Sequence, residues 1–195
     1  MTLTLPSWPE SLALVFTTVS IGLAARNSVH TWWTGIIGCV LFGWVYADAR
    51  LYAETTLQLF FLVTSALGWW QWRQRSNGAV ASRPVTRAPL LQLLGLLALA
   101  AVATVGYGAL LHRLTDAYMP YWDAALLGLS VMAQCLLMQR RLETWPVWLL
   151  VNTLSVPLFW QRELHLTALL YVAYWLNAWH GWWHWRRLLP REATR

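Results

Sequence analysis

Gly68-Trp69-Trp70-Gln71-Trp72-Arg73 is the stretch around which the chain is organised, because a second copy, Gly181-Trp182-Trp183-His184-Trp185-Arg186, follows 113 residues later. Each copy of this Trp box (residues 68–73 and 181–186) ends an apolar run and leads into arginine. The same shift aligns Thr31-Trp32 with Thr144-Trp145 without a gap. It pairs residues 10–73 with residues 123–186, and 12 of these 64 residue pairs are identical. An ungapped register with identities clustered in the box indicates an internal repeat.

The composition is typical of a membrane protein. Hydrophobic residues make up 58% of the 195 residues and charged residues only 11%, whereas soluble domains carry about 25% charged residues. All 14 basic residues are arginines, and they stand in short clusters between apolar runs. This pattern favours a lipid bilayer as partner and no nucleic acid. We expect no signal peptide, because a basic n-region and a cleavage site are missing.

Seven stretches are long and apolar enough to cross a bilayer, which takes about 20 residues. We predict membrane helices over residues 10–25, 30–47, 51–72, 90–111, 121–138, 144–160 and 164–185. The connections between them are short and polar. The exception is residues 74–89, which are rich in Arg, Ser, Gly and Pro and are expected to form a solvated linker.

The distribution of arginines predicts how the chain is oriented. Eleven arginines fall on the side of the linker and the C-terminal tail, against three on the other side, Arg50, Arg113 and Arg162. Cytoplasmic loops carry the excess of arginine. We therefore expect a multi-pass membrane protein with its N-terminus outside and its C-terminus in the cytoplasm.

The repeat and the helix count together predict an architecture. A copy of three helices would be inverted if it followed the first copy directly, and one extra helix restores its direction. We expect an all-α membrane protein with seven transmembrane helices in a 3+1+3 arrangement and two parallel triple-helix bundles, as in some transporters. The domains would be a first bundle at 1–73, a cytoplasmic linker at 74–89, a connecting helix at 90–113, a second bundle at 114–187 and a tail at 188–195.

Polar side chains inside these spans are candidates for a substrate site, because lipid disfavours them unless they face protein or water. They are Gln58, Gln134, Asn152, Asn177 and His180. Amides donate and accept hydrogen bonds and suit a polyhydroxylated or amide-bearing ligand. The alternative is that they hydrogen-bond to a neighbouring helix.

Two acidic residues near span ends are further candidates. Glu54 lies one turn before Gln58 on the same helix face, where it either attracts a cation or is only an interfacial residue. Asp123 follows Pro120 at the start of a span, so helix capping is the alternative to a role in binding.

Trp69 and Trp72 are three residues apart and share a helix face. A pair at this spacing beside a cavity could hold a flat cationic ring by cation–π attraction. The alternative is an interfacial belt, where tryptophan is enriched in membrane proteins.

His180 and His184, also on one face, raise a haem-binding redox protein as an alternative of another class. No metal-ligand motif, Ser-His-Asp order or Gly-rich phosphate loop is present, and we expect no enzyme, no cofactor and no metal. In the sequence, a helix surface that faces lipid and one that faces a partner subunit look alike. The sequence therefore leaves open whether the protein forms a homo-oligomer.

Several of these segments resemble the PnuC family of bacterial vitamin transporters. The matching segments are Leu51-Tyr52-Ala53-Glu54, Leu57-Gln58, Gly68-Trp69 with Trp72, Pro120-Tyr121-Trp122-Asp123, Trp145 to Trp148, and Asn152. The resemblance implies uptake of nicotinamide riboside, a small-molecule substrate, across the bacterial inner membrane by facilitated diffusion, with a separate cytoplasmic kinase trapping the product. It also implies that Gln58, Trp69, Trp72 and Asn152 surround the ligand.

The chain departs from the family pattern next to the second Trp box. His180 stands where the family leads us to expect Asn, and the following Trp182-Trp183 is bulkier than usual. Thiamine, another flat cation, or another vitamin or nucleoside of the same family is therefore the alternative cargo.

Overall fold

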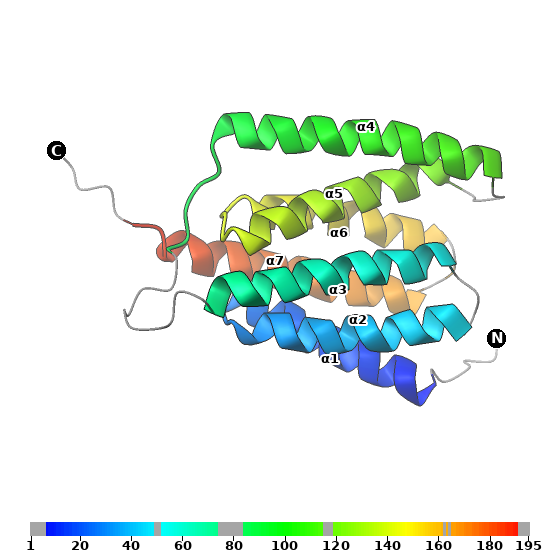
Figure 1. Ribbon diagram of the computed structural model, residues 1–195, viewed down its shortest axis with the longest axis horizontal. Helices are drawn as coiled ribbons and strands as arrows, with labels where there is room; N and C mark the ends of the chain where they lie inside the picture. The colour runs from blue at the N-terminus through cyan, green and yellow to red at the C-terminus, as the bar shows by residue number, and fades with distance from the viewer. Residues whose placement is uncertain are drawn as a thin grey trace. The chain divides into compact units, whose positions relative to one another are not determined.

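The structure, a computed structural model, describes residues 7–48, 52–73, 84–114, 119–161, 163 and 165–190. The described residues form α1 (Trp8–Ala25), α2 (His30–Asp48), α3 (Tyr52–Arg73), α4 (Leu90–Leu114), α5 (Pro120–Met138), α6 (Thr144–Gln161) and α7 (His165–Arg187) (Figure 1). The all-α fold class with seven helices is confirmed, and every helix begins and ends within three residues of its predicted bounds. The 3+1+3 arrangement stays a prediction.

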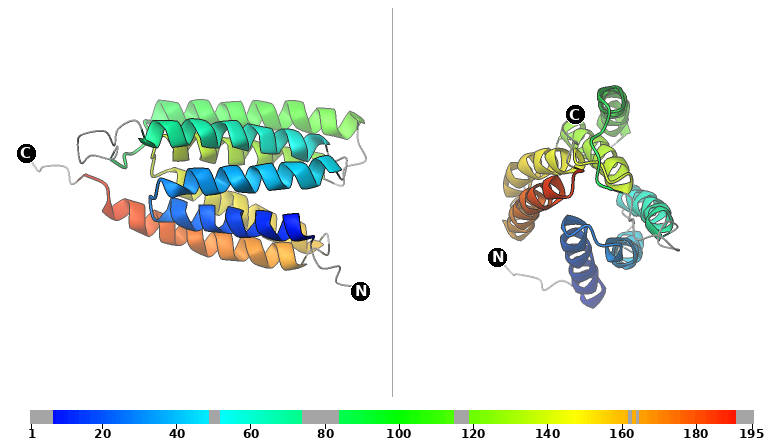
Figure 2. Two further views of the ribbon diagram at one scale, coloured as in Figure 1. Left: turned by 60° about the horizontal axis from the view of Figure 1, so that its bottom comes forward. Right: turned by 90° about the vertical axis from the view of Figure 1, so that its left-hand side faces the viewer.

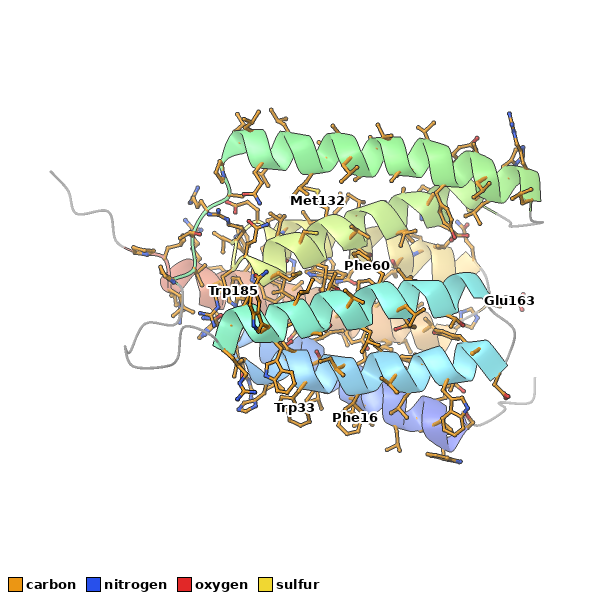
Figure 3. All side chains as sticks on the ribbon, in the orientation of Figure 1. Phe16, Trp33, Phe60, Met132, Glu163 and Trp185 are labelled. Carbon is orange, nitrogen blue, oxygen red and sulfur yellow. The ribbon has the colours of Figure 1, made fainter. Side chains whose placement is uncertain are left out.

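Three of the described helices, α1, α4 and α5, are long and apolar enough to cross a membrane by length and composition. Among these, α4 is the most apolar, with a mean hydropathy of 2.1. Its Leu91 and Val102 are 83% and 70% exposed, and its side chains stand free on the face turned away from α5 (Figure 3). This exposure suits a helix that faces acyl chains.

The chain divides into two compact units, residues 1–83 and residues 84–195. In the first unit, α2 contacts both α1 and α3. In the second unit, α5 contacts α4 and α6, and α6 contacts α7. Figure 2 shows α1 and α2 of the first unit side by side. The boundary between the units falls within the segment expected to be a linker.

The two units build the same turn after their first repeat helix. Asn27 after α1 and Arg140 after α5 stand at equivalent positions of the repeat, and both adopt left-handed backbone angles, with φ of 54° and 55°. In both turns the N–H of the next residue donates to the carbonyl five residues earlier, at 3.0 and 2.9 Å. This is the Schellman motif that ends helices, and it turns the chain back into the following helix.

Each unit also ties its first two repeat helices together through a threonine. Thr31 Oγ1 donates to the carbonyl of Ser20 at 2.8 Å, and Thr144 Oγ1 donates to the carbonyl of Ala133 at 2.9 Å. Both bonds span 11 residues, and donor and acceptor are each related by the shift of 113. The internal repeat is therefore structural as well as sequential.

Buried tryptophan pairs join the second and third helix of each repeat. Trp32 of α2 meets Trp72 of α3 edge to face, with ring centroids 5.1 Å apart and planes at 85°. Trp145 of α6 meets Trp185 of α7 in the same way, at 5.4 Å and 85°. Edge-to-face pairs are a favoured aromatic geometry, so these rings form the core of each unit.

Glycine allows this packing. A Cβ on Gly68 would lie 2.5 Å from the Trp32 ring, and a Cβ on Gly181 would lie 2.7 Å from the Trp145 ring. No side chain fits at those distances, so the first residue of each Trp box is glycine because an indole rests on the helix backbone there.

Residues 84–88 differ from the solvated linker expected for 74–89, of which residues 74–83 lie outside the described part. Val85 is 1% exposed. Thr86 pairs with the α5–α6 turn, donating to the carbonyl of Arg140 at 3.1 Å and accepting from the N–H of Leu142 at 3.0 Å. A buried valine and paired backbone groups hold this segment on the second unit as a strap (residues 84–88).

Candidate functional site

Gln58 is half-buried on α3 and lines a cavity of about 280 Å³ between α2 and α3. Cys39 and Gly43 of α2 form the opposite wall. The Cβ of Gln58 lies 3.7 Å from the position that a Cβ on Gly43 would take, so the absence of a side chain at Gly43 leaves room beside the glutamine. Glu54 belongs to the same helix, but its side chain lies outside the described part.

Trp69 lies near the C-terminal end of α3 and offers a ring face to a cation. The guanidinium carbon of Arg73 lies 5.3 Å from the centroid of the Trp69 ring, within the distance at which a cation and an aromatic face attract each other. The two residues are four apart, hence on one helix face. This site therefore already holds a delocalised, planar cation.

Trp72 has a different environment from Trp69. It is 7% exposed and packs against Trp32, as described above. Its second-repeat counterpart, Trp185, is 0% exposed. These contacts favour a packing role for the last tryptophan of each box, and a contact between Trp72 and a ligand stays a prediction.

The remaining candidates belong to the second unit. Asn152 of α6 and Gln134 of α5 are buried, with 4% and 8% of their surface exposed. Asp123 lies in the first turn of α5, where the helix dipole favours a carboxylate. Asn177 is half-buried on α7. Because Gln58 and Trp69 belong to the other unit, it stays a prediction that all of these residues surround one ligand.

His180 is exposed on α7 and stacks against His184, with ring centroids 6.2 Å apart and planes at 11°. In the described part of the chain, no three His, Cys, Asp or Glu side chains lie close enough together to hold a metal ion. Trp182 is the counterpart of Trp69. Its ring packs against another indole, because the ring centroids of Trp179 and Trp182 are 5.1 Å apart.

Sequence reasoning missed three participants. Arg73 drew attention only as the last residue of the Trp box. Its spacing of four residues from Trp69 is the signal that its cation can lie over the Trp69 ring. Cys39 stands in an apolar run that gives it no role, and the repeat offers a signal there, because Asn152 is its counterpart. Trp32 was noticed only as a marker of the repeat, and its contact with Gly68 depends on tertiary packing.

Comparison with known proteins shows extended similarity. Residues 7–187 match the model of a family described as nicotinamide mononucleotide transporter. A nicotinamide riboside transporter, PnuC, of Escherichia coli (strain K12) is 25% identical over 85% of this chain and 80% of its own length. One from Neisseria mucosa is 29% identical over 96% of this chain and 75% of its own length.

Two further relatives extend the comparison. A riboflavin/roseoflavin transporter, RibM, of Streptomyces davaonensis is 26% identical over 86% of this chain and 79% of its own length. A crystal structure of the vitamin B3 transporter PnuC superimposes with a TM-score of 0.73 at 26% identity, covering 94% of this chain and 82% of that one. The similarity therefore extends from sequence to fold.

Proposed function

Because the chain belongs to the nicotinamide mononucleotide transporter family, we propose that it carries nicotinamide riboside across the bacterial inner membrane. A family of transporters makes the chain a multi-pass membrane protein and not an enzyme. The riboside is the proposed cargo because it is named for the relatives in Escherichia coli and Neisseria mucosa. Membership in this family gives no support to the haem-binding alternative.

The observation that carries the proposal is the cation over Trp69. Nicotinamide riboside presents a flat pyridinium with a delocalised positive charge, an amide and ribose hydroxyls. The guanidinium of Arg73, 5.3 Å from the Trp69 ring, is also planar and delocalised, so a pyridinium can replace it on the same face. Amides such as Gln58 and Asn152 can donate to and accept from the ligand amide and hydroxyls.

We propose that transport is facilitated diffusion and that a separate cytoplasmic kinase traps the product. Phosphorylation alone would keep the inward gradient of the riboside, so that no coupled ion is needed for uptake. The eleven arginines on the side of the linker favour a cytoplasmic position for that side, where a kinase would meet the emerging riboside.

The test is uptake of labelled nicotinamide riboside into vesicles that contain the purified protein and no kinase. The label should equilibrate without accumulating, at a rate that a proton ionophore leaves unchanged, and it should accumulate once a riboside kinase and ATP are enclosed. Uptake no faster than in protein-free vesicles would contradict the cargo. Collapse with the proton gradient would contradict facilitated diffusion only.

A second candidate cargo is another vitamin, because the riboflavin/roseoflavin transporter, at 26% identity, is about as similar to the chain as the riboside transporter of Escherichia coli, at 25%. Thiamine also fits, since its thiazolium is a flat cation. Unlabelled riboflavin, thiamine, nicotinamide mononucleotide and nicotinamide riboside would be compared as competitors in the same vesicles. The strongest competitor identifies the cargo, and strongest competition by riboflavin or thiamine would replace the riboside.

A further inference from the structure

The cavity between α2 and α3 differs in chemistry from the Trp69 site. None of its seven lining residues is charged or aromatic. Val40 and Leu59, on its two sides, are 54% and 56% exposed, so the cavity can be entered from that face. Five of the seven lining residues are apolar, and the two polar ones, Thr55 and Gln58, are uncharged. Walls of this kind suit an uncharged group, because a cation placed there would lose its hydration without gaining an opposite charge.

The second unit shows what fills the equivalent groove. The shift of 113 places Trp175 where the first unit has Leu62, and Thr153 where it has Val40. Both Leu62 and Val40 line the cavity. In the second unit, the indole N–H of Trp175 donates to Thr153 Oγ1 at 3.2 Å, across the groove between α6 and α7. That groove therefore takes an indole from its own chain.

Smaller side chains leave the first groove without such a ring. Gly43 replaces Val156 of the second unit, and Leu62 replaces the larger Trp175. The resulting 280 Å³ exceeds the volume of about 150 Å³ in which an apolar cavity binds benzene. It falls below the range of about 300–1,000 Å³ for pockets that enclose whole drug-sized ligands. The cavity thus has room for one ring system.

We propose that the α2–α3 groove of the first unit is a binding site for one uncharged aromatic ring of about the size of indole, distinct from the cation site on Trp69. The groove shares Gln58 with the proposed riboside site, but ring binding is measured without transport, so that failure of this proposal and failure of the proposed cargo are distinguished. Gly43 and Leu62 set the size of the site, and the thiol of Cys39 in its wall reports occupancy.

The test uses the purified full-length chain carrying Cys135→Ala, in which Cys39 is the one remaining cysteine. The rate at which N-ethylmaleimide modifies Cys39 is measured with increasing indole. A bound ring covers the thiol, so the rate should fall with occupancy, by about tenfold when indole reaches ten times its dissociation constant. Indole should also raise the midpoint of thermal unfolding of the wild type, a second readout that needs no thiol.

Substitutions taken from the second unit provide matched controls. Leu62→Trp should slow the modification of Cys39 in the absence of indole and remove the effect of added indole. Gly43→Val changes the wall of the cavity less than Leu62→Trp does. It should still abolish the rise in the unfolding midpoint that indole causes. Trp175→Leu alters only the second unit and should leave the protection of Cys39 by indole as in the wild type.

Two results would overturn the proposal. One is an indole effect that is absent, or that persists unchanged in both Leu62→Trp and Gly43→Val, because indole would then act elsewhere or through the detergent. The other is protection of Cys39 by a straight-chain alcohol of equal hydrophobicity at least as strong as that by indole. The groove would then be a binding site for lipid acyl chains and not for an aromatic ring.

Discussion

Trp69 and Trp72 stand three residues apart on one helix, yet their rings have different neighbours. The face of Trp69 holds the Arg73 guanidinium, whereas Trp72 is enclosed by Trp32. Spacing along a helix predicts that two side chains share a face. It does not predict which of them packs inward, because that depends on the helix that lies opposite.

Replacing Trp69 with alanine should weaken binding of nicotinamide riboside. The loss of one cation–π contact of about 0.5–2 kcal/mol corresponds to a dissociation constant about twofold to thirtyfold higher, measured by calorimetry on the purified protein. Trp70→Ala is the control, because Trp70 is 58% exposed and points to another face. Equal affinity in the Trp69 variant and the wild type would remove Trp69 from the site.

Replacing Gly68 with alanine should destabilise the first unit. The added Cβ would lie 2.5 Å from the Trp32 ring, and such overpacking costs about 1–3 kcal/mol. The thermal unfolding midpoint of Gly68→Ala, and of Gly181→Ala in the second unit, should drop by several degrees. Gly95→Ala is the control, since nothing lies within 4 Å of its added Cβ; a similar drop there would refute the packing explanation.

At the scale of elements, the strap at residues 84–88 belongs to the second unit through side chains as well as backbone. Arg141 Nη1 donates to Thr86 Oγ1 and to the carbonyl of Arg87, each at 2.8 Å. The N–H of Ala88 donates to Glu143 Oε2 at 2.7 Å. These bonds fix the start of α4 against the turn between α5 and α6.

Arg141→Ala should loosen the strap and expose the bond after Arg87 to trypsin. Two partly exposed, charge-assisted hydrogen bonds contribute about 1 kcal/mol after allowance for solvent, which corresponds to about fivefold faster cleavage in limited proteolysis. Arg187→Ala, at the exposed end of α7, is the control. Trypsin should cleave this variant after Arg87 at the wild-type rate. Identical rates for both variants would show that Arg141 does not hold the segment.

The length of α4 illustrates how far local pattern predicts an element. The apolar run ends at Leu111, but the helix continues to Leu114. His112 and Arg113 occupy its last turn, where basic side chains favour the negative end of the helix dipole. Similarly, α1 begins at Trp8 and not at Glu10, because a proline in the first turn suits a helix start.

At the scale of the whole molecule, the arginine distribution predicts which side of the membrane each loop occupies. Alkaline phosphatase fused after Leu114 should be active, because that fusion ends outside, whereas the same enzyme fused after Arg187 should be inactive. Green fluorescent protein fused after Arg187 should fluoresce. The reverse pattern would contradict the proposed orientation and place the kinase on the wrong side.

The sequence by itself determined the membrane class, the seven helices and the repeat. Each membrane helix satisfies its own backbone hydrogen bonds, so an apolar run of sufficient length predicts a helix without knowledge of its neighbours. The repeat is visible because both Trp boxes kept their glycine, tryptophans and arginine.

Only the tertiary structure decided which residues meet. Thr86 and Arg141 are 55 residues apart in the chain, and no local pattern pairs them. The groove between α2 and α3 is free of an indole because Gly43 has no side chain opposite Gln58 and Leu62 stands at the position of Trp175, while Trp175 spans the equivalent groove of the second unit. Such differences arise from the volumes of side chains on facing helices, which a one-dimensional pattern of polar and apolar residues does not contain.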